Sequence, residues 1–261
     1  MKPETVLITG ASSGIGLELA KCFAADKSNL ILVARNTAAL EKLADELRCE
    51  HKIETHVITA DLSRPESPQI IFDELKGRGI IVDVLVNNAG FGLHGGFAEL
   101  PLPHQLEIIQ VNIAALVALT GLFLPGMVQR KGSGGILNVG SVAGFLPGPN
   151  MAVYYASKAF VLSFSEALHE ELLGTGVSVT NLCPGPTESN FSQVARSHRV
   201  RETRARKMSA ASVAQIGHAD FRNKKCLSVP GLKNKMLAVI GSKFLPRKVA
   251  RKLSSHYNKP K

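Results

Sequence analysis

Short apolar runs alternate with amphipathic stretches through most of the chain. The runs are rich in Val, Ile and Leu and lie at 5–10, 29–35, 54–61, 80–90, 134–141 and 177–183, with a shorter one at 225–231. Such runs are typical of strands that are buried on both faces of a parallel sheet. Between them, 14–26, 37–50, 68–79, 103–129 and a stretch from about 153 have the pattern of helices. We predict an α/β fold, a doubly wound parallel sheet of about seven strands with helices on both faces, in a single domain.

The chain divides into this domain and a C-terminal extension. Residues 1–230 form the predicted domain, and a segment at about 186–220 that contains the basic run RSHRVRETRARK is expected to be a mobile lid. Residues 231–261 form the extension. With 261 residues, 45% hydrophobic and 20% charged, the composition is that of a globular protein with a substantial core. It is not that of a disordered chain.

The net charge of +10 is concentrated in the C-terminal extension and the residues just before it. Residues 221–261 contain 12 Lys and Arg and no Asp or Glu, which leaves 19 basic residues against 21 acidic ones elsewhere. After Pro246, Val249 and Leu253 share a helix face among basic side chains, a pattern of helices that lie on an anionic membrane. A helix that covers a pocket or contacts another subunit explains the same pattern, and we prefer it. With no tryptophan and no reading motif, we expect no nucleic-acid partner.

A glycine-rich turn, TGASSGIG, connects the first strand to the first helix. Gly10 permits a tight turn, Gly14 allows backbone to approach a pyrophosphate, and Gly16 allows the helix to pack on the strand. The helix N-terminus supplies N–H groups and a positive dipole end for phosphates. Gly/Ser turns are common, so this motif gains weight from its place at the start of a βαβ unit. The predicted cofactor contacts of this turn are Gly10, Ser12, Ser13, Gly14, Ile15 and Gly16.

The end of the second strand indicates which dinucleotide binds. An NAD site usually places an acidic residue there for the ribose 2′-hydroxyl, whereas this chain has Ala34 and Arg35. A guanidinium suits a 2′-phosphate, to which Ser12 or Ser13 could add a hydroxyl, so we predict NADP(H). A solvated arginine at a strand end is the plainer alternative. Asp61 and Leu62, after the third strand, are expected near the adenine.

Tyr154 and Lys158 are four residues apart and therefore share one face of the predicted helix, whereas Tyr155 points elsewhere. Tyrosine has a pKa of about 10, and a nearby ammonium favours the phenolate and lowers that pKa. Ser141, at the preceding strand end, could hydrogen-bond a substrate carbonyl oxygen. Tyr and Lys occur at this spacing on many exposed helices. Their convergence with the glycine-rich turn at one sheet edge is what favours chemistry.

Together, TGASSGIG, NNAG, SVAGFLPGPNMAVYYASK and NLCPGPTESNF resemble the short-chain dehydrogenase/reductase family, over about residues 6–191. The resemblance implies a Rossmann-type NADP-binding catalytic domain at 1–230, with Tyr154 as general acid/base, Lys158 as its tuning partner and Ser141 as the carbonyl-binding residue. It also implies that Asn112 supports a water relay behind the lysine, and that the subunits form a homodimer or homotetramer through the helices around Asn112 and Tyr154. Further cofactor contacts are implied at Asn88, Ala89, Gly90, Tyr154, Lys158, Pro184, Gly185, Thr187 and Ser189.

The expected activity is NADPH-dependent reduction of a carbonyl to a secondary alcohol. The substrate is expected to be an apolar ketone or aldehyde, such as a 3-oxoacyl, steroid-like or lipid carbonyl, because apolar side chains flank the predicted cleft. A dinucleotide-binding sensor or membrane-docked scaffold without catalysis is the alternative, although such a protein would be expected to lack the tyrosine or the lysine. The apolar side chains, which could equally be lid packing, are Phe91, Leu93, Phe145, Leu146, Phe191 and Val194.

The remaining residues bear on metal binding and location. The four cysteines form no CxxC pair and the histidines do not cluster, so no metal is expected. The thiols indicate a reducing compartment. We expect no signal peptide and no run of the ~20 apolar residues that span a membrane. The predicted location is the cytoplasm, with the C-terminal extension as a potential contact to a membrane.

Overall fold

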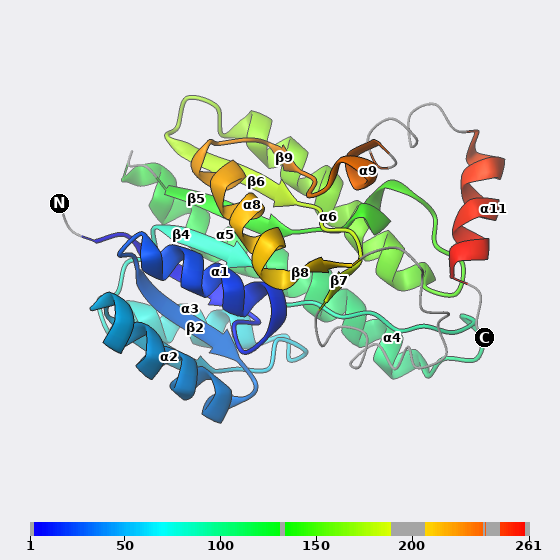
Figure 1. The fold of residues 1–261 in the computed structure, drawn as a ribbon. Helices are drawn as coiled ribbons and strands as arrows, with labels where there is room; N and C mark the ends of the chain where they lie inside the picture. The colour runs from blue at the N-terminus through cyan, green and yellow to red at the C-terminus, as the bar shows by residue number, and fades with distance from the viewer. Residues whose placement is uncertain (1–2, 131–133, 189–206, 237, 239–245, 259–261) are drawn as a thin grey trace.

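The computed structural model describes residues 3–130, 134–188, 207–236, 238 and 246–258. Seven parallel strands form its central sheet, in the order β3-β2-β1-β4-β5-β6-β9 (Figure 1). The predicted doubly wound sheet in a single domain is confirmed. The strands of this sheet are β1 (Thr5–Thr9), β2 (Asn29–Ala34), β3 (Thr55–Thr59), β4 (Val84–Asn87), β5 (Gly134–Val139), β6 (Val177–Leu182) and β9 (Leu227–Ser228).

Helices cover both faces of the sheet (Figure 1). On one face lie α1 (Gly14–Ala25), α2 (Thr37–His51) and α8 (Ala210–Arg222). On the other lie α3 (Ser67–Gly77), α5 (Ala115–Gln129) and α6 (Ala152–Glu171). The remaining described elements are α4 (Leu102–Ile109), a π-turn (Gln110–Ala114), a 3-10 turn (Val142–Phe145), the paired short strands β7 (Thr187–Glu188) and β8 (Met208–Ser209), α9 (Leu232–Lys235) and α11 (Arg247–Tyr257).

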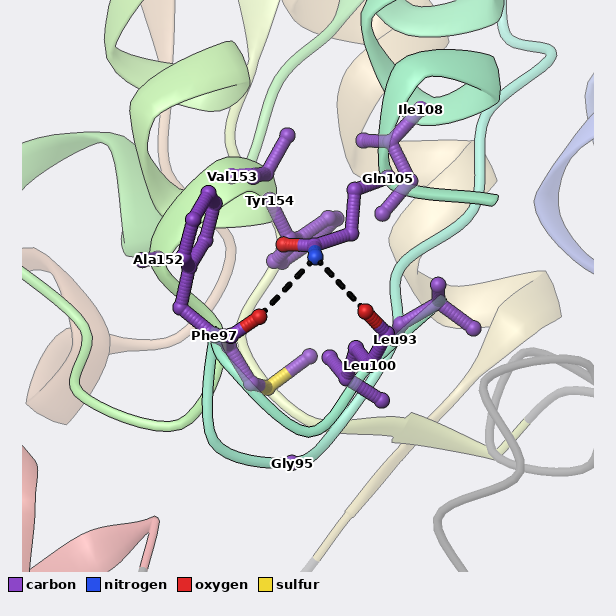
Figure 2. Close-up of a pocket in the computed structure, with 10 residues that line it drawn as sticks. Leu93, Gly95, Phe97, Leu100, Gln105, Ile108, Ala152, Val153 and Tyr154 are labelled. Atoms are coloured by element: carbon purple, nitrogen blue, oxygen red, sulfur yellow. Dashed lines mark hydrogen bonds between the residues drawn. The ribbon is translucent and has the colours of Figure 1, made fainter. Parts of the chain in front are cut away.

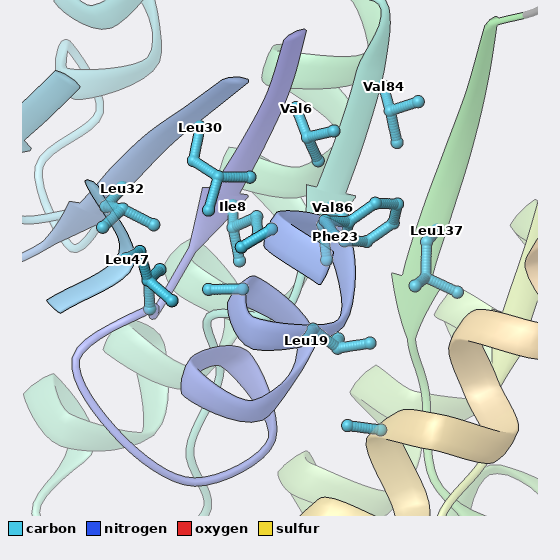
Figure 3. Packing of buried hydrophobic residues seen from close by; sticks show 14 of the residues in the cluster. Val6, Ile8, Leu19, Phe23, Leu30, Leu32, Leu47, Val84, Val86 and Leu137 are labelled. Atoms are coloured by element: carbon cyan, nitrogen blue, oxygen red, sulfur yellow. The ribbon is translucent and has the colours of Figure 1, made fainter. Parts of the chain in front are cut away.

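Two apolar cores form because successive side chains of a strand point to opposite faces of the sheet. In β1, Val6 and Ile8 belong to the core under α1, whereas Leu7 belongs to the core under α3 and α5. Figure 3 shows the first core, where Leu19 and Phe23 of α1 lie over the strands. All five of these side chains are fully or almost fully buried. This packing fixes the carboxyl ends of the strands at one edge of the sheet.

The C-terminal part of the predicted lid segment lies in a helix that packs on the sheet. Residues 210–222 form α8, which buries Val213, Ala214, Gly217 and Phe221 in the first core. The spacing of these residues is that of an amphipathic helix, so burial against α1 and β6 is the stable arrangement. Most of the remaining lid, residues 189–206, lies outside the described residues.

The expectation that no run is long enough to span a membrane is wrong. Among the described residues, Leu102–Gln129 is one helical stretch that is long and apolar enough by length and composition, and a window of 18 residues within it has a mean hydropathy of 2.0. It nevertheless carries buried polar side chains, Asn112 and Thr120, whose partners are Ser157 and Asn87. Its C-terminal half belongs to the second core. In this fold one face of the stretch packs on the sheet, and the π-turn at Gln110–Ala114 joins its two halves.

Candidate active site

The glycine-rich turn lies where the order of strands reverses, between β1 and its neighbours β2 and β4. Gly10 and Gly14 have φ values of +66° and +58°, which favour glycine. A Cβ on Gly16 would collide with the carbonyl oxygen of Gly10 and the side-chain nitrogen of Asn88. The predicted reasons for Gly10 and Gly16 are therefore visible as a turn and a close approach. In open α/β sheets, this crevice is where ligands bind.

The N-terminus of α1 fits a bound phosphate. Its first backbone N–H groups have no intrahelical acceptor, as in any helix. Ser13, at the N-cap position, makes no side-chain capping hydrogen bond, and the first turn contains no acidic residue. N–H groups and the positive helix end thus face the turn without competition from a protein anion. The residues present fit the pyrophosphate of a dinucleotide.

Asn88 holds the glycine-rich turn in place. Its side-chain nitrogen donates to the carbonyl oxygens of Thr9 and Gly10 at 2.9 and 3.2 Å. The hydroxyl of Thr9 accepts from the backbone N–H groups of Asn88 and Ala89, both at 3.0 Å. The sequence predicted Asn88 as a cofactor contact, and the structure gives its amide nitrogen a bracing role. Thr9, which binds the two strand ends together, was not predicted.

Arg35 follows β2 directly, and its side chain is exposed. Asp61 lies close enough to feel its charge. Burial acts to raise the pKa of Asp61, but hydrogen bonds from Ser63 and the charges of Arg35 and Arg64 outweigh it, so the pKa lies below its usual value. Leu62 is buried beside Asp61, in the second core. Arg35 and Asp61 therefore lie near each other at the ends of neighbouring strands, and their contact with the ribose and adenine stays a prediction.

Ser141 and Tyr154 come together at the end of β5. Ser141 caps the 3-10 turn by accepting from the backbone N–H of Ala143 at 3.1 Å, and it hydrogen-bonds the Tyr154 side chain. The ring of Tyr154 is packed against the loop after β4, because a Cβ on Gly92 would lie 2.9 Å from it. The predicted serine–tyrosine pair is thus assembled by contacts that reach across the sheet edge.

Lys158 lies one helical turn from Tyr154 on α6 and is 5% exposed. Its ammonium donates to the carbonyl oxygen of Val139 at 2.8 Å and lies 5.9 Å from the centre of the Tyr154 ring. A Cβ on Gly90 would lie 3.4 Å from the same nitrogen. The lysine therefore sits between the catalytic tyrosine candidate and the NNAG segment, where a nicotinamide ribose is expected.

The pKa values differ from the predicted tuning. Burial raises the pKa of Tyr154 to about 12, although the hydrogen bond from Ser141 acts to lower it. Burial lowers the pKa of Lys158 to about 8. We expected the ammonium to lower the tyrosine pKa, but here it is directed to a backbone carbonyl while the phenol is desolvated. At neutral pH, Tyr154 is therefore an acid that still holds its proton.

Asn112 lies in the π-turn between α4 and α5, and π-bulges are frequent at functional sites. Its amide nitrogen donates to the Phe91 carbonyl oxygen and to Ser157 Oγ, both at 3.0 Å. Ser157 in turn donates to the backbone carbonyl of Tyr154 at 2.7 Å. Asn112 thus joins the loop after β4 to the catalytic helix. Ser157, which makes this link, was not predicted.

The loop after β6 lies beside Ser141. The backbone N–H of Val142 donates to the carbonyl oxygen of Pro184 at 3.0 Å, and Thr187 Oγ1 donates to Gly185 at 2.9 Å. A Cβ on Gly185 would collide with Asn234, so α9 lies against this loop. Ser189, Phe191 and Val194 lie outside the described residues.

Mostly apolar side chains line a small hollow beside Tyr154 (Figure 2). Gln105 closes one wall by donating to the carbonyl oxygens of Phe97 and Leu100, both at 3.1 Å. Leu93, predicted as a pocket residue, lines the hollow; Phe91, Phe145 and Leu146 do not. The lining residues are Leu93, Gly95, Phe97, Leu100, Gln105, Ile108, Met151, Ala152, Val153 and Tyr154.

Two more buried residues near the site, Cys183 and Asn258, are not predicted from the sequence as site residues. Cys183 is fully buried near Lys158, and burial raises the pKa of its thiol to about 12. Asn258, just after α11, accepts hydrogen bonds from His94 and Asn150. Neither residue has a local sequence signal, because both contacts depend on the fold. The described residues hold no group of three or more His, Cys, Asp or Glu side chains arranged so that they could hold a metal ion, and the absence of a metal stays a prediction.

Comparisons with known proteins place the chain in a family. The sequence profile of the short chain dehydrogenase family matches residues 4–200. The chain is 40% identical to sulfoacetaldehyde reductase 2 of Chromohalobacter salexigens over 192 residues, 73% of this chain and 75% of the relative. It is 34% identical to the human very-long-chain 3-oxoacyl-CoA reductase over 187 residues, 69% of this chain and 58% of that longer protein.

Solved structures show the same fold. A short-chain dehydrogenase from Sphingobium yanoikuyae in complex with NADPH is 33% identical, with a TM-score of 0.82 over 92% of this chain and 93% of the other. A short-chain dehydrogenase/reductase from Burkholderia phymatum in complex with NAD is 25% identical, with a TM-score of 0.80 over 92% of each chain. Similar proteins therefore bind a nicotinamide dinucleotide of either type.

Proposed function

The chain belongs to the short-chain dehydrogenase/reductase family, and on that premise we propose that it is an NADP(H)-dependent reductase of an apolar ketone or aldehyde. One observation carries the proposal. Ser141, Tyr154 and Lys158 converge at the end of β5, beside a glycine-rich turn that fits a pyrophosphate. That two similar proteins are named as reductases supports the direction of the reaction.

The protein residues divide the work of reduction. When bound, a nicotinamide cofactor would supply the hydride for the carbonyl carbon. The hydroxyl groups of Ser141 and Tyr154 bind the carbonyl oxygen, and negative charge that develops there is stabilised by both. The Tyr154 proton then passes to this oxygen and completes the alcohol. Because its pKa is about 12, Tyr154 holds that proton throughout the neutral range.

Lys158 and Asn112 act behind the tyrosine. We assign to the Lys158 ammonium a hydrogen bond to the nicotinamide ribose, which Gly90 admits by having no side chain. Asn112 keeps the loop after β4 against α6 through Phe91 and Ser157. We propose that proton return to Tyr154 runs past Lys158 by water near Asn112. This relay is a proposal from the family resemblance.

The substrate is an apolar carbonyl compound in this proposal. The hollow beside Tyr154 has side chains that are almost all apolar, among them Leu93, Phe97 and Met151. A 3-oxoacyl chain, a steroid-like ketone and a lipid carbonyl all satisfy this requirement. The 3-oxoacyl-CoA reductase among the relatives favours the first of these.

Replacing Arg35 with alanine tests whether the protein prefers NADP(H) to NAD(H). Arg35→Ala is expected to weaken NADPH binding by roughly 10- to 100-fold, the value of hydrogen bonds to a charged group, because the 2′-phosphate loses its cation. NADH binding should stay unchanged, since NADH has no such phosphate. The measurement is a fluorescence titration of both cofactors with wild type and variant at low salt.

Three other outcomes bear on the proposal. Equal affinity of the wild type for both cofactors, or preference for NADH, would show that Arg35 is a solvated surface residue and contradict the NADP(H) assignment. Binding of neither cofactor would favour a protein without catalysis. Lys42, exposed on α2, serves as a control when replaced by alanine.

We also propose a homodimer. Exposed apolar side chains lie on α4, α5 and α6, and such patches mark protein interfaces. A face built from helices of this kind can pair with a second copy about a twofold axis. Sedimentation velocity is expected to show a dimer, and a monomer at micromolar concentration would contradict it. The exposed residues are Leu102, Leu106, Ile109, Val117 and Phe160.

We propose a cytoplasmic location. All four cysteines are free thiols in the structure, which a reducing compartment maintains. Cys183 is buried beside Lys158, so its reduced state is also compatible with the site.

A further inference from the structure

Helix α11 leaves two large apolar side chains, Val249 and Leu253, exposed. A helix on a globular protein normally buries its apolar stripe. In α11 the buried positions are Ala250 and Ser254, at 6% and 5% exposure, whereas Val249 and Leu253 are 41% and 53% exposed. Figure 1 shows α11 at the edge of the molecule, apart from the helices that cover the sheet. The described residues therefore leave this apolar stripe uncovered.

Basic side chains border this stripe. Arg247, Lys248, Arg251 and Lys252 are all exposed, and α11 contains no acidic residue. Residues 221–261 contain 12 Lys and Arg without a compensating Asp or Glu. An apolar stripe with cationic borders is the arrangement of helices that lie in the interface of an anionic bilayer.

The inner side of α11 is attached to the loops that border Tyr154. The backbone oxygen of Asn258 accepts from His94 Nε2 at 2.9 Å and from Asn150 Nδ2 at 3.0 Å. Its side-chain oxygen accepts from the Tyr155 hydroxyl at 3.4 Å. His94 lies in the loop after β4, Asn150 in the segment that leads into α6, and Tyr155 in the first turn of α6. A surface bound by the outer side of α11 is thus held close to the candidate active site.

We propose that the exposed face of α11, with Val249 and Leu253 inserted and Lys248, Arg251 and Lys252 at its borders, docks the protein on an anionic lipid bilayer. A second copy of the chain is a poorer partner, since twofold pairing of this face would bring like charges together. Nucleic acid would leave the apolar stripe unused. The inference adds a partner to the proposed reductase, and docking itself does not depend on catalysis.

If the protein is the reductase proposed above, docking also determines from where the substrate enters the site. The loops held by Asn258 would lie at the bilayer surface, beside the hollow that Leu93 and Met151 line. An apolar carbonyl compound dissolved in the membrane could then reach Tyr154 without crossing water.

The test is flotation of the full-length protein with phosphatidylcholine vesicles, with and without phosphatidylglycerol. Wild-type protein should float with the anionic vesicles at low salt and float less at high salt. With neutral vesicles it should remain in the bottom fraction of the gradient. Val249→Ser together with Leu253→Ser should lower partitioning roughly tenfold or more, because two apolar side chains no longer insert. Lys248→Glu with Lys252→Glu should lower it as well.

A matched control removes equal apolar surface elsewhere. Ile70→Ser with Ile81→Ser replaces two residues that are 56% and 46% exposed and lie outside the C-terminal extension, and should float like wild type. Unchanged thermal unfolding of all variants would show that they fold. The proposal would be overturned if wild-type protein remained in the bottom fraction with anionic vesicles at low salt, or if the Val249/Leu253 variant floated as well as wild type. Self-association of the protein through this helix without vesicle binding would also overturn the proposal.

NADPH titration of the same samples separates this proposal from the proposed function. Protein that binds NADPH but does not float would contradict the docking proposal only. Failure to bind cofactor with intact flotation would affect the reductase proposal only.

Discussion

Replacing Tyr154 with phenylalanine should lower kcat for carbonyl reduction by roughly 100- to 10,000-fold, the range of general acid catalysis. The ring and its packing against Gly92 remain, so the fold and the affinity for NADPH should hardly change. What is lost is the proton that neutralises the developing alkoxide. Single-turnover rates with saturating NADPH and a reactive apolar ketone measure the effect.

Tyr155→Phe is the matched control for this change. It removes the same atom from the next residue, whose hydroxyl is directed to Asn258. We expect it to retain most of the turnover. If Tyr154→Phe kept wild-type turnover, Tyr154 could not be the proton donor, and the assignment of the whole site would be wrong.

Lys158→Ala should lower kcat/KM for NADPH by roughly 100-fold, because a charged hydrogen-bond donor at the ribose site is removed. The same lysine should shape the pH profile. With a pKa of about 8, its ammonium is present below that pH and is lost above it. Wild-type kcat/KM should therefore be level up to about pH 8 and fall beyond it. Tyr154, with a pKa of about 12, stays protonated across this range and adds no limb of its own.

The variant and a control distinguish this explanation from a general effect of pH. Lys158→Ala should have no inflection near pH 8, whereas Lys21→Ala, at an exposed position on α1, should have the wild-type profile. A wild-type profile that stays level well beyond pH 8 would contradict the depressed lysine pKa. This test uses the wild-type profile alone, so it holds even if Lys158→Ala is inactive.

Local patterns were sufficient for the fold class and the centre of the site. The alternation of apolar runs and helical stretches determined the parallel sheet, since both periods are properties of adjacent residues. The spacing of Tyr154 and Lys158 determined their common helix face in the same way. The glycine-rich turn could be placed because Gly10 needs a positive φ.

Other features depended on residues far apart in the chain. Asn88 braces the turn through Thr9, 79 residues away. Residues 210–220, predicted as the end of the lid, belong to the core helix α8, because the apolar stripe of that helix packs against α1 and β6. The tail could not be assigned from its charges until Asn258 was found against His94 and Asn150.

The sequence by itself thus determined the doubly wound sheet, the cofactor turn and the identity of the candidate Ser141, Tyr154 and Lys158. Only the tertiary structure decided their protonation, because burial, which raises the pKa of Tyr154 and lowers that of Lys158, is set by every element packed around them. It also decided that α11 buries Ala250 and Ser254 and leaves Val249 and Leu253 outside. Periodicity shows that a helix has two faces, but the surface it packs on decides which one meets solvent.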